Sequence, residues 1–215
     1  MILDIHPLLS ILCSVLIING FYNLSKFVSK TKYLIFLENH AVGGRLISFF
    51  LIINFFSIIL YNFFLLFGIN EIYLKILIIL LILIGFYKPD NIQKLFKKYV
   101  LIDNKSKLLL FIIILGYALI SLLPITDPDS LDYHLTFPYL SLINKSFFIQ
   151  NEWFTSQLTG AGEALIIFGL SINAYKLSSI LQFVALLSII IAILNLKHEK
   201  HYLNLNSKIL ICLAI

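Results

Sequence analysis

Residues 125–163, ITDPDSLDYHLTFPYLSLINKSFFIQNEWFTSQLTGAGE, form the longest polar interruption in a chain that otherwise consists of apolar runs. The stretch holds five of the 11 acidic residues, and its only lysine or arginine is Lys145. Three of its carboxylates fall within six positions and are followed by a tyrosine and a histidine: Asp127, Asp129, Asp132, Tyr133 and His134. We therefore expect the chemistry of the chain to lie here, at the end of an apolar run.

The composition of the whole chain is that of a membrane protein. Hydrophobic residues make up 60% of the 215 residues and charged residues 13%, whereas soluble proteins carry about 25% charged residues. Several apolar runs approach the roughly 20 residues that cross a hydrocarbon layer of about 30 Å. The sequence therefore predicts an all-α fold, a polytopic bundle of transmembrane helices.

The apolar runs predict five membrane spans and the start of a sixth. The five cover about residues 5–22, 46–67, 72–87, 108–123 and 175–196, and the partial one covers residues 209–215. A shorter apolar piece, residues 164–170, follows the acidic stretch. Because the last run is too short to span, we expect residues 1–215 to be one transmembrane domain, cut off within the sixth helix and belonging to a larger fold.

The basic residues predict how these spans are oriented. The 16 lysines and arginines give the chain a net charge of +5, and they concentrate in the links 23–45, 88–107 and 197–208. Basic links stay on the cytoplasmic side, and these three share one side if every run crosses once. We therefore place the N-terminus and the loop 125–163 on the external face of the cell (inner) membrane, and we expect no nucleic-acid partner.

The external loop has the pattern of an amphipathic helix lying along the membrane. Asp127 suits the N-cap before Pro128, and Asp129 is a first-turn acid that the helix dipole favours. At about 100° per residue, an apolar stripe separates from a polar face. The stripe consists of Leu131, Leu135, Pro138 and Leu142, and the polar face consists of Asp129, Asp132 and Thr136. The stripe should face lipid or the bundle, the carboxylates should face an aqueous cavity, and Pro138 should kink the helix.

Two interpretations of the acidic residues stay open. Asp127 can serve only as a cap, and Glu163, after Gly160 and Gly162, can serve as a cap-region acid of the next helix. However, two carboxylates three positions apart on one helical face repel each other, and ionisable groups at a membrane often mark a functional site. The cluster as a whole therefore favours a functional site.

The segment TDPDSLDYHLTFPYLSLINKSFF, residues 126–148, resembles the first external loop of polytopic GT-C glycosyltransferases. That group includes bacterial lipid A aminoarabinose transferase and the protein O-mannosyltransferases. Its members similar to this chain carry an acid, an aromatic or Tyr-His pair and then a proline, which correspond here to Asp129, Tyr133, His134 and Pro138. The resemblance covers about residues 108–196, although residues 158–163 stand where the family often has a Pro-Pro-Leu element.

The resemblance implies an enzyme that moves a sugar from a polyprenyl-phosphate donor to a lipid or glycan acceptor. It implies that Asp129 is the essential acid, with Asp127 or Asp132 next in line. A carboxylate near the acceptor can accept its proton as the glycosidic bond forms, and a lysine or a divalent metal can stabilise the departing phosphate. The candidate substrate-binding residues are Tyr133, His134, Lys145, Glu163 and Lys176; for the two lysines, solvation or snorkelling is the alternative.

A multi-pass transporter or flippase is the alternative hypothesis. Such a protein should carry acidic residues within its spans and broken helices at mid-membrane. The acidic residues of this chain lie almost wholly in links and at the ends of spans, which favours the enzyme. A third hypothesis, a non-catalytic membrane fragment, would be separated from the enzyme by the downstream sequence, since an enzyme should continue with several more spans.

Overall fold

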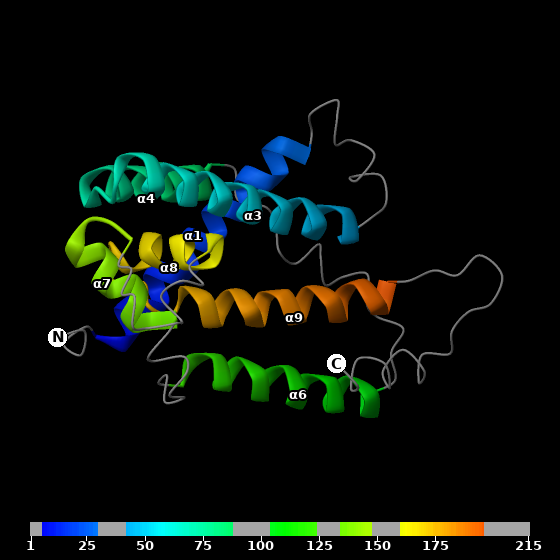
Figure 1. Ribbon diagram of the computed structural model, residues 1–215. Helices are drawn as coiled ribbons and strands as arrows, with labels where there is room; N and C mark the ends of the chain where they lie inside the picture. Colours follow the sequence, from blue (N-terminus) through cyan, green and yellow to red (C-terminus); the bar gives the residue numbers. More distant parts are fainter. Residues whose placement is uncertain (1–5, 30–41, 88–103, 124–133, 148–159, 196–215) are drawn as a thin grey trace.

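The computed structural model describes residues 6–29, 42–87, 104–123, 134–147 and 160–195, and within these ranges the regular structure is entirely α-helical (Figure 1). The all-α prediction is confirmed for this part of the chain. The seven helices are α1 (Pro7–Ser29), α3 (Val42–Phe67), α4 (Glu71–Phe86), α6 (Asn104–Leu122), α7 (Phe137–Asn144), α8 (Ala161–Leu170) and α9 (Leu177–Asn195).

Each of the five predicted spans coincides with a helix, but only two of these helices are long and apolar enough to cross a membrane. They contain the segments Pro7–Val28 of α1 and Ile47–Phe67 of α3. Helix α4 has 16 residues, and the apolar parts of α6 and α9 are the shorter segments Leu108–Leu122 and Leu177–Ile190. By length and composition alone, the two longer helices indicate a possible membrane protein.

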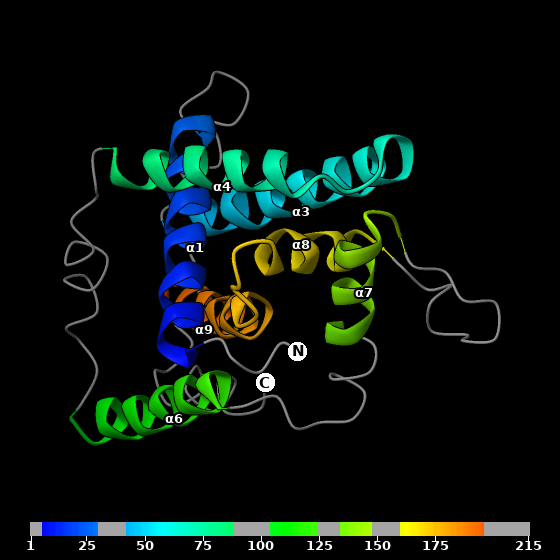
Figure 2. The ribbon, with the colours of Figure 1, turned by 90° about the vertical axis from the view of Figure 1, so that its left-hand side faces the viewer.

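Helix α1 crosses α3 and α4 steeply and packs closely against both (Figure 2). The closest approach is at Gly20, where a Cβ atom would lie 2.4 Å from the carbonyl oxygen of Leu81. The side-chain amides of Asn19 and Asn23 both donate to the carbonyl of Gly85, at 2.9 and 2.6 Å. That carbonyl is one of the last four of α4, which have no partner within the helix. The two asparagines therefore clamp the end of α4 to α1.

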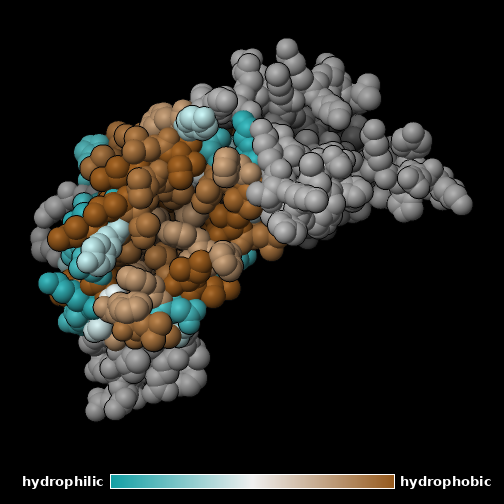
Figure 3. All heavy atoms as spheres, turned by 90° about the horizontal axis from the view of Figure 1, so that it is seen from above, coloured by the Kyte–Doolittle hydropathy of each residue, from teal (hydrophilic) through white to brown (hydrophobic). Residues whose placement is uncertain are grey.

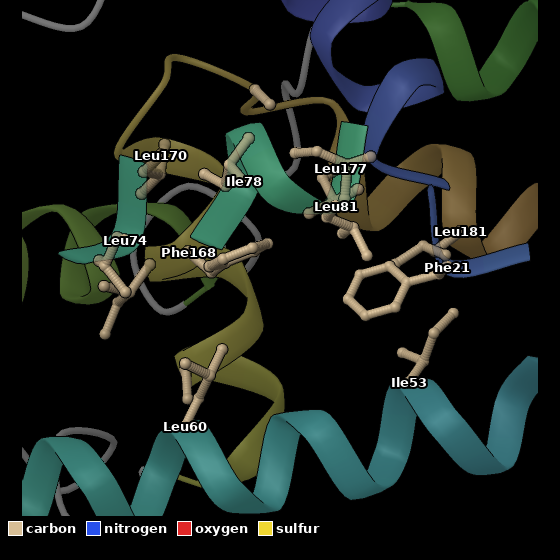
Figure 4. Close-up of a cluster of buried hydrophobic side chains, with 14 of the residues drawn as sticks. Phe21, Ile53, Leu60, Leu74, Ile78, Leu81, Phe168, Leu170, Leu177 and Leu181 are labelled. Carbon is tan, nitrogen blue, oxygen red and sulfur yellow. The ribbon is translucent and has the colours of Figure 1, made fainter. Parts of the chain in front are cut away.

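The apolar core is shared by six helices, α1, α3, α4, α7, α8 and α9, and Figure 4 shows part of it. The ring of Phe56 stands edge-on to Phe21 of α1 and to Phe168 of α8, with centroids 5.0 and 5.1 Å apart. Ala164, Ile167 and Phe168 of α8 are fully buried. Helix α8 has only ten residues, yet it lies inside the packed core. This packing holds the residues of its first turn in place.

The outer faces of α3, α4 and α6 remain apolar and exposed. Seen from above, the surface over α3 and α4 is mostly hydrophobic (Figure 3). Helix α6 packs against α9 and exposes residues such as Phe111 and Ile120. Exposed apolar faces of this kind mark contacts with a membrane or with another protein.

The helix expected in the external loop is described only from His134 onward, so its start at Asp127 lies outside the described residues. Residues 134–136 form a π-type turn and α7 follows. Pro138 is the second residue of α7, and the kink predicted at this residue stays a prediction. Pro138 and Leu142 are buried and Leu135 is half-buried. The apolar stripe of the described part therefore faces the bundle.

Candidate functional site

A cavity of about 370 Å³ lies where α8 and α9 meet the turn that precedes α7. Ligand pockets in proteins commonly measure about 300–1,000 Å³ and combine apolar walls with a few polar groups. The described residues that line it are His134, Leu135, Gly162, Glu163, Leu165, Ile166, Tyr175, Leu177, Ser178, Ser179, Leu181 and Gln182. The cavity therefore has the size and the mixed lining of a small-molecule site.

Glu163 is the carboxylate of this cavity and is held rigidly. It lies in the first turn of α8, where its Oε2 accepts a hydrogen bond of 2.8 Å from the N–H of Gly160. The hydroxyl of Ser57 donates to the carbonyl of Ala161 and so ties the same turn to α3. The interpretation of Glu163 as a cap-region acid is confirmed by its hydrogen bond. The same side chain, only 9% exposed, also lines the cavity.

His134 brings an imidazole to the second oxygen of this carboxylate. Its Nδ1 lies 3.6 Å from Oε1 of Glu163, and its side chain is 47% exposed. Both groups line the cavity, so a ligand bound there can contact the imidazole and the carboxylate together.

The acidic residues expected to do the chemistry precede this pair in the chain. Asp127, Asp129, Asp132 and Tyr133 lie outside the described residues, and their assignment stays a prediction. His134 is the first residue after them that the structure describes, and it lines the cavity. The chain thus reaches the cavity wall directly after its acidic stretch.

Lys145 is not brought to the cavity. It adopts the left-handed conformation, with φ of 55°, at the C-terminal end of α7. Its carbonyl accepts a hydrogen bond of 2.7 Å from the N–H of Ile69, in the turn between α3 and α4. In the described part of the chain, Lys145 therefore docks the end of α7 on that turn.

Lys176 is buried, with 1% of its surface exposed, so the expectation of solvation or snorkelling is wrong for this residue. Its Nζ donates to the carbonyl of Leu123 at the end of α6 and lies 5.5 Å from the centre of the Tyr175 ring. Its backbone N–H donates to the hydroxyl of Ser10, at 3.1 Å. A cation at a helix C-terminus is favourable. The side chain thus joins α6 to the connection that enters α9, next to the cavity.

The sequence did not lead us to predict the polar residues that line the cavity at the start of α9, which are Ser178, Ser179 and Gln182 of the helix and Tyr175 just before it. Their signal was present, because Ser178 and Gln182 are four positions apart and share one face of an otherwise apolar helix. The run was interpreted only as a membrane span, so that polar face received no role.

A metal site is not assembled by the described residues. No three histidine, cysteine, aspartate or glutamate side chains within those ranges lie close enough to hold an ion.

Comparison with known proteins places the chain in a family. The model of the DUF1420 N-terminal domain matches residues 82–211. No curated protein and no solved structure matches the chain. The matched range includes all the residues named above as lining the cavity and covers more than half of the sequence. The chain therefore belongs to the DUF1420 family, of which residues 82–211 form the N-terminal domain.

Proposed function

We propose that this protein is a membrane glycosyltransferase that moves a sugar from a polyprenyl-phosphate donor to a lipid or glycan acceptor at the external face of the cell membrane. The observation that carries the proposal is the cavity beside Glu163. His134, which follows the acidic stretch, and the buried carboxylate of Glu163 both line this cavity. The outer faces of α3, α4 and α6 are apolar.

The surroundings of the cavity suit a donor that is part lipid and part sugar. A polyprenyl chain needs an apolar surface, which the exposed faces of α3, α4 and α6 supply. The sugar needs hydrogen-bonding groups in a sheltered space, which the cavity supplies. Lys176 ties the end of α6 to the connection before α9, and the neighbours of Lys176 in the chain, Tyr175 and Leu177, line the cavity.

In this proposal the carboxylates divide the work. Asp129 is the general base that accepts the proton of the attacking acceptor, with Asp127 or Asp132 as the alternative base. Tyr133, His134 and Glu163 bind substrate, and the 3.6 Å approach of His134 to Glu163 supports the last two. We assign no phosphate contact to Lys176, because its side chain is buried and does not line the cavity. A divalent metal held by the acidic stretch would supply charge for the leaving phosphate.

A transporter or flippase for a small polar or lipid-linked substrate is the second candidate function. One observation favours it: the largely apolar helix α9 contributes polar side chains, including Gln182, to the lining of the cavity. Polar groups in apolar helices often mark a substrate pathway. Transport of a lipid-linked sugar across proteoliposomes, without formation of a glycosylated product, would identify this function.

A transfer assay on the full-length protein in liposomes tests the proposal. Donors are prenyl phosphates that carry different single sugars, and acceptors are lipids and glycans. The variant Asp129→Asn should lower kcat by about 100-fold or more, because general-base catalysis contributes factors of about 100 to 10,000. Glu71→Gln is the control, since Glu71 forms an exposed ion pair with Lys75, at 2.9 Å, on α4. Full turnover in both Asp129→Asn and Asp132→Asn would reject the general-base assignment.

A further inference from the structure

The polar side chains of α9 gather at one place. The helix is apolar over most of its 19 residues, yet Ser178, Ser179 and Gln182 fall within its first two turns and all line the cavity. The next polar residue, Ser188, does not line it; its hydroxyl donates to the carbonyl of Val184 at 2.6 Å. The polarity of α9 is therefore concentrated where the helix borders the cavity.

Two of these side chains have hydrogen-bonding capacity that the protein does not use. The hydroxyl of Ser179 donates to the carbonyl of Lys176, at 3.1 Å. Neither Ser178 nor Gln182 makes a side-chain hydrogen bond to another residue within the described ranges. Because they are four positions apart, they project side by side from one face of the helix. Ser178 is half-buried and Gln182 is exposed, so both side chains are open to hydrogen bonds with water or with a ligand in the cavity.

The charge of the cavity limits what this ligand can be. Its described lining contains the carboxylate of Glu163, the imidazole of His134 beside it, and no lysine or arginine. The nearby ammonium of Lys176 is buried against the carbonyl of Leu123. A phosphate would meet the carboxylate with no lysine or arginine in the described lining to offset its charge, whereas hydroxyl groups match the neutral donors and acceptors of a serine and a glutamine.

We propose that this cavity is the sugar subsite, and that Ser178 and Gln182 bind hydroxyl groups of the sugar ring. The inference rests on the proposed function and deepens it, since it separates the site of the sugar from the site of the phosphate. Tyr175 lines the same cavity and offers a flat apolar face against which the C–H face of a sugar ring packs. The phosphate and the prenyl chain of the donor lie outside this cavity.

The test measures binding and transfer by the full-length protein in lipid nanodiscs. The probes are farnesyl phosphate and farnesyl phosphate that carries glucose, mannose, galactose or 4-aminoarabinose. The variants are Ser178→Ala and Gln182→Met, and Ser188→Ala is the matched control because it removes a hydroxyl from the same helix away from the cavity. Methionine keeps the length of glutamine, and thermal unfolding verifies that each variant folds.

We expect the parent protein to bind at least one of the sugar-bearing lipids more tightly than farnesyl phosphate. Each cavity variant should weaken that binding by about fivefold, the effect of one lost hydrogen bond, and leave binding of farnesyl phosphate unchanged. In the transfer assay the same variants should raise the donor KM with little change in kcat, unlike Asp129→Asn. Ser188→Ala should match the parent in both assays.

The outcomes separate the inference from the proposed function. If the parent transfers sugar but the double variant Ser178→Ala/Gln182→Met retains the parent's preference and KM, the subsite is wrong and the glycosyltransferase stands. If both variants weaken farnesyl phosphate as much as its sugar conjugates, the cavity holds the phosphate or the lipid, and the subsite is again wrong. If the parent binds sugar-bearing lipids through Ser178 and Gln182 but never forms product, the subsite stands and the proposed transfer reaction is rejected.

Discussion

The substitution Gly20→Ala tests the close packing of α1 on α4. A Cβ at this position would lie 2.4 Å from the carbonyl oxygen of Leu81 and 2.6 Å from its Cγ. The first of these atoms belongs to the backbone, so a side-chain rotation cannot relieve the clash and the two helices must separate. Gly116 in α6 is the matched control, because a Cβ there would meet nothing within 4 Å.

Both variants gain the higher helix propensity of alanine, but only Gly20→Ala also introduces a steric clash. Replacing glycine by alanine inside a helix is worth about 0.8–1 kcal/mol at both positions. Overpacking costs about 1–3 kcal/mol and applies only at Gly20, at the upper end because a backbone atom is hit. We therefore expect Gly116→Ala to unfold at or above the parent temperature. Gly20→Ala should be less stable than Gly116→Ala by about 2–3 kcal/mol.

Thermal unfolding of the purified full-length protein in detergent measures this difference. About 2–4 °C per kcal/mol is typical of chains of 150–250 residues, so the two melting temperatures should differ by roughly 5–10 °C. A Gly20→Ala protein that melts at or above Gly116→Ala would refute the close approach of α1 and α4.

Two further predictions follow from single contacts. Replacing Asn19 or Asn23 by alanine should each cost less than about 1 kcal/mol, because the carbonyl of Gly85 keeps one donor. The double variant should lose more stability in thermal unfolding than the sum of the two single variants, and a merely additive loss would contradict the clamp. Glu163→Gln keeps an acceptor for the cap and should melt close to the parent, whereas Glu163→Ala should lose about 1 kcal/mol of stability. Both variants should lower sugar transfer, and equal melting of the two would contradict the cap.

The helices were predictable because apolar length is a local property of the sequence. The predicted span 46–67 lies within α3, and the predicted span 72–87 differs from α4 by one residue at each end. The cap role of Glu163 was also readable, since it needs only a residue three positions before it. In both cases the interaction that decides the structure lies within a few residues of the position.

The long-range contacts were not predictable in the same way. Lys176 is buried through a bond to Leu123, 53 positions earlier, and a second to Ser10, 166 positions earlier. A lysine at the end of an apolar run looks like a snorkelling residue unless the helix that receives its ammonium is known. The polar face of α9 was missed for the same reason, because its role depends on how α8 and α9 pack.

Helix α8 holds the carboxylate of the candidate site in a fixed position. Its buried face, centred on Phe168, packs into the core shared with α1 and α3, and its first turn is fixed by the bonds of Gly160 to Glu163 and of Ser57 to Ala161. These contacts leave Glu163 little freedom, whereas His134 is half-exposed on another element. Functional geometry depends on such support from residues that never touch the ligand. The carboxylate is thus the fixed reference of the cavity, and a substrate that contacts both groups depends on how the segment that carries His134 is positioned against it.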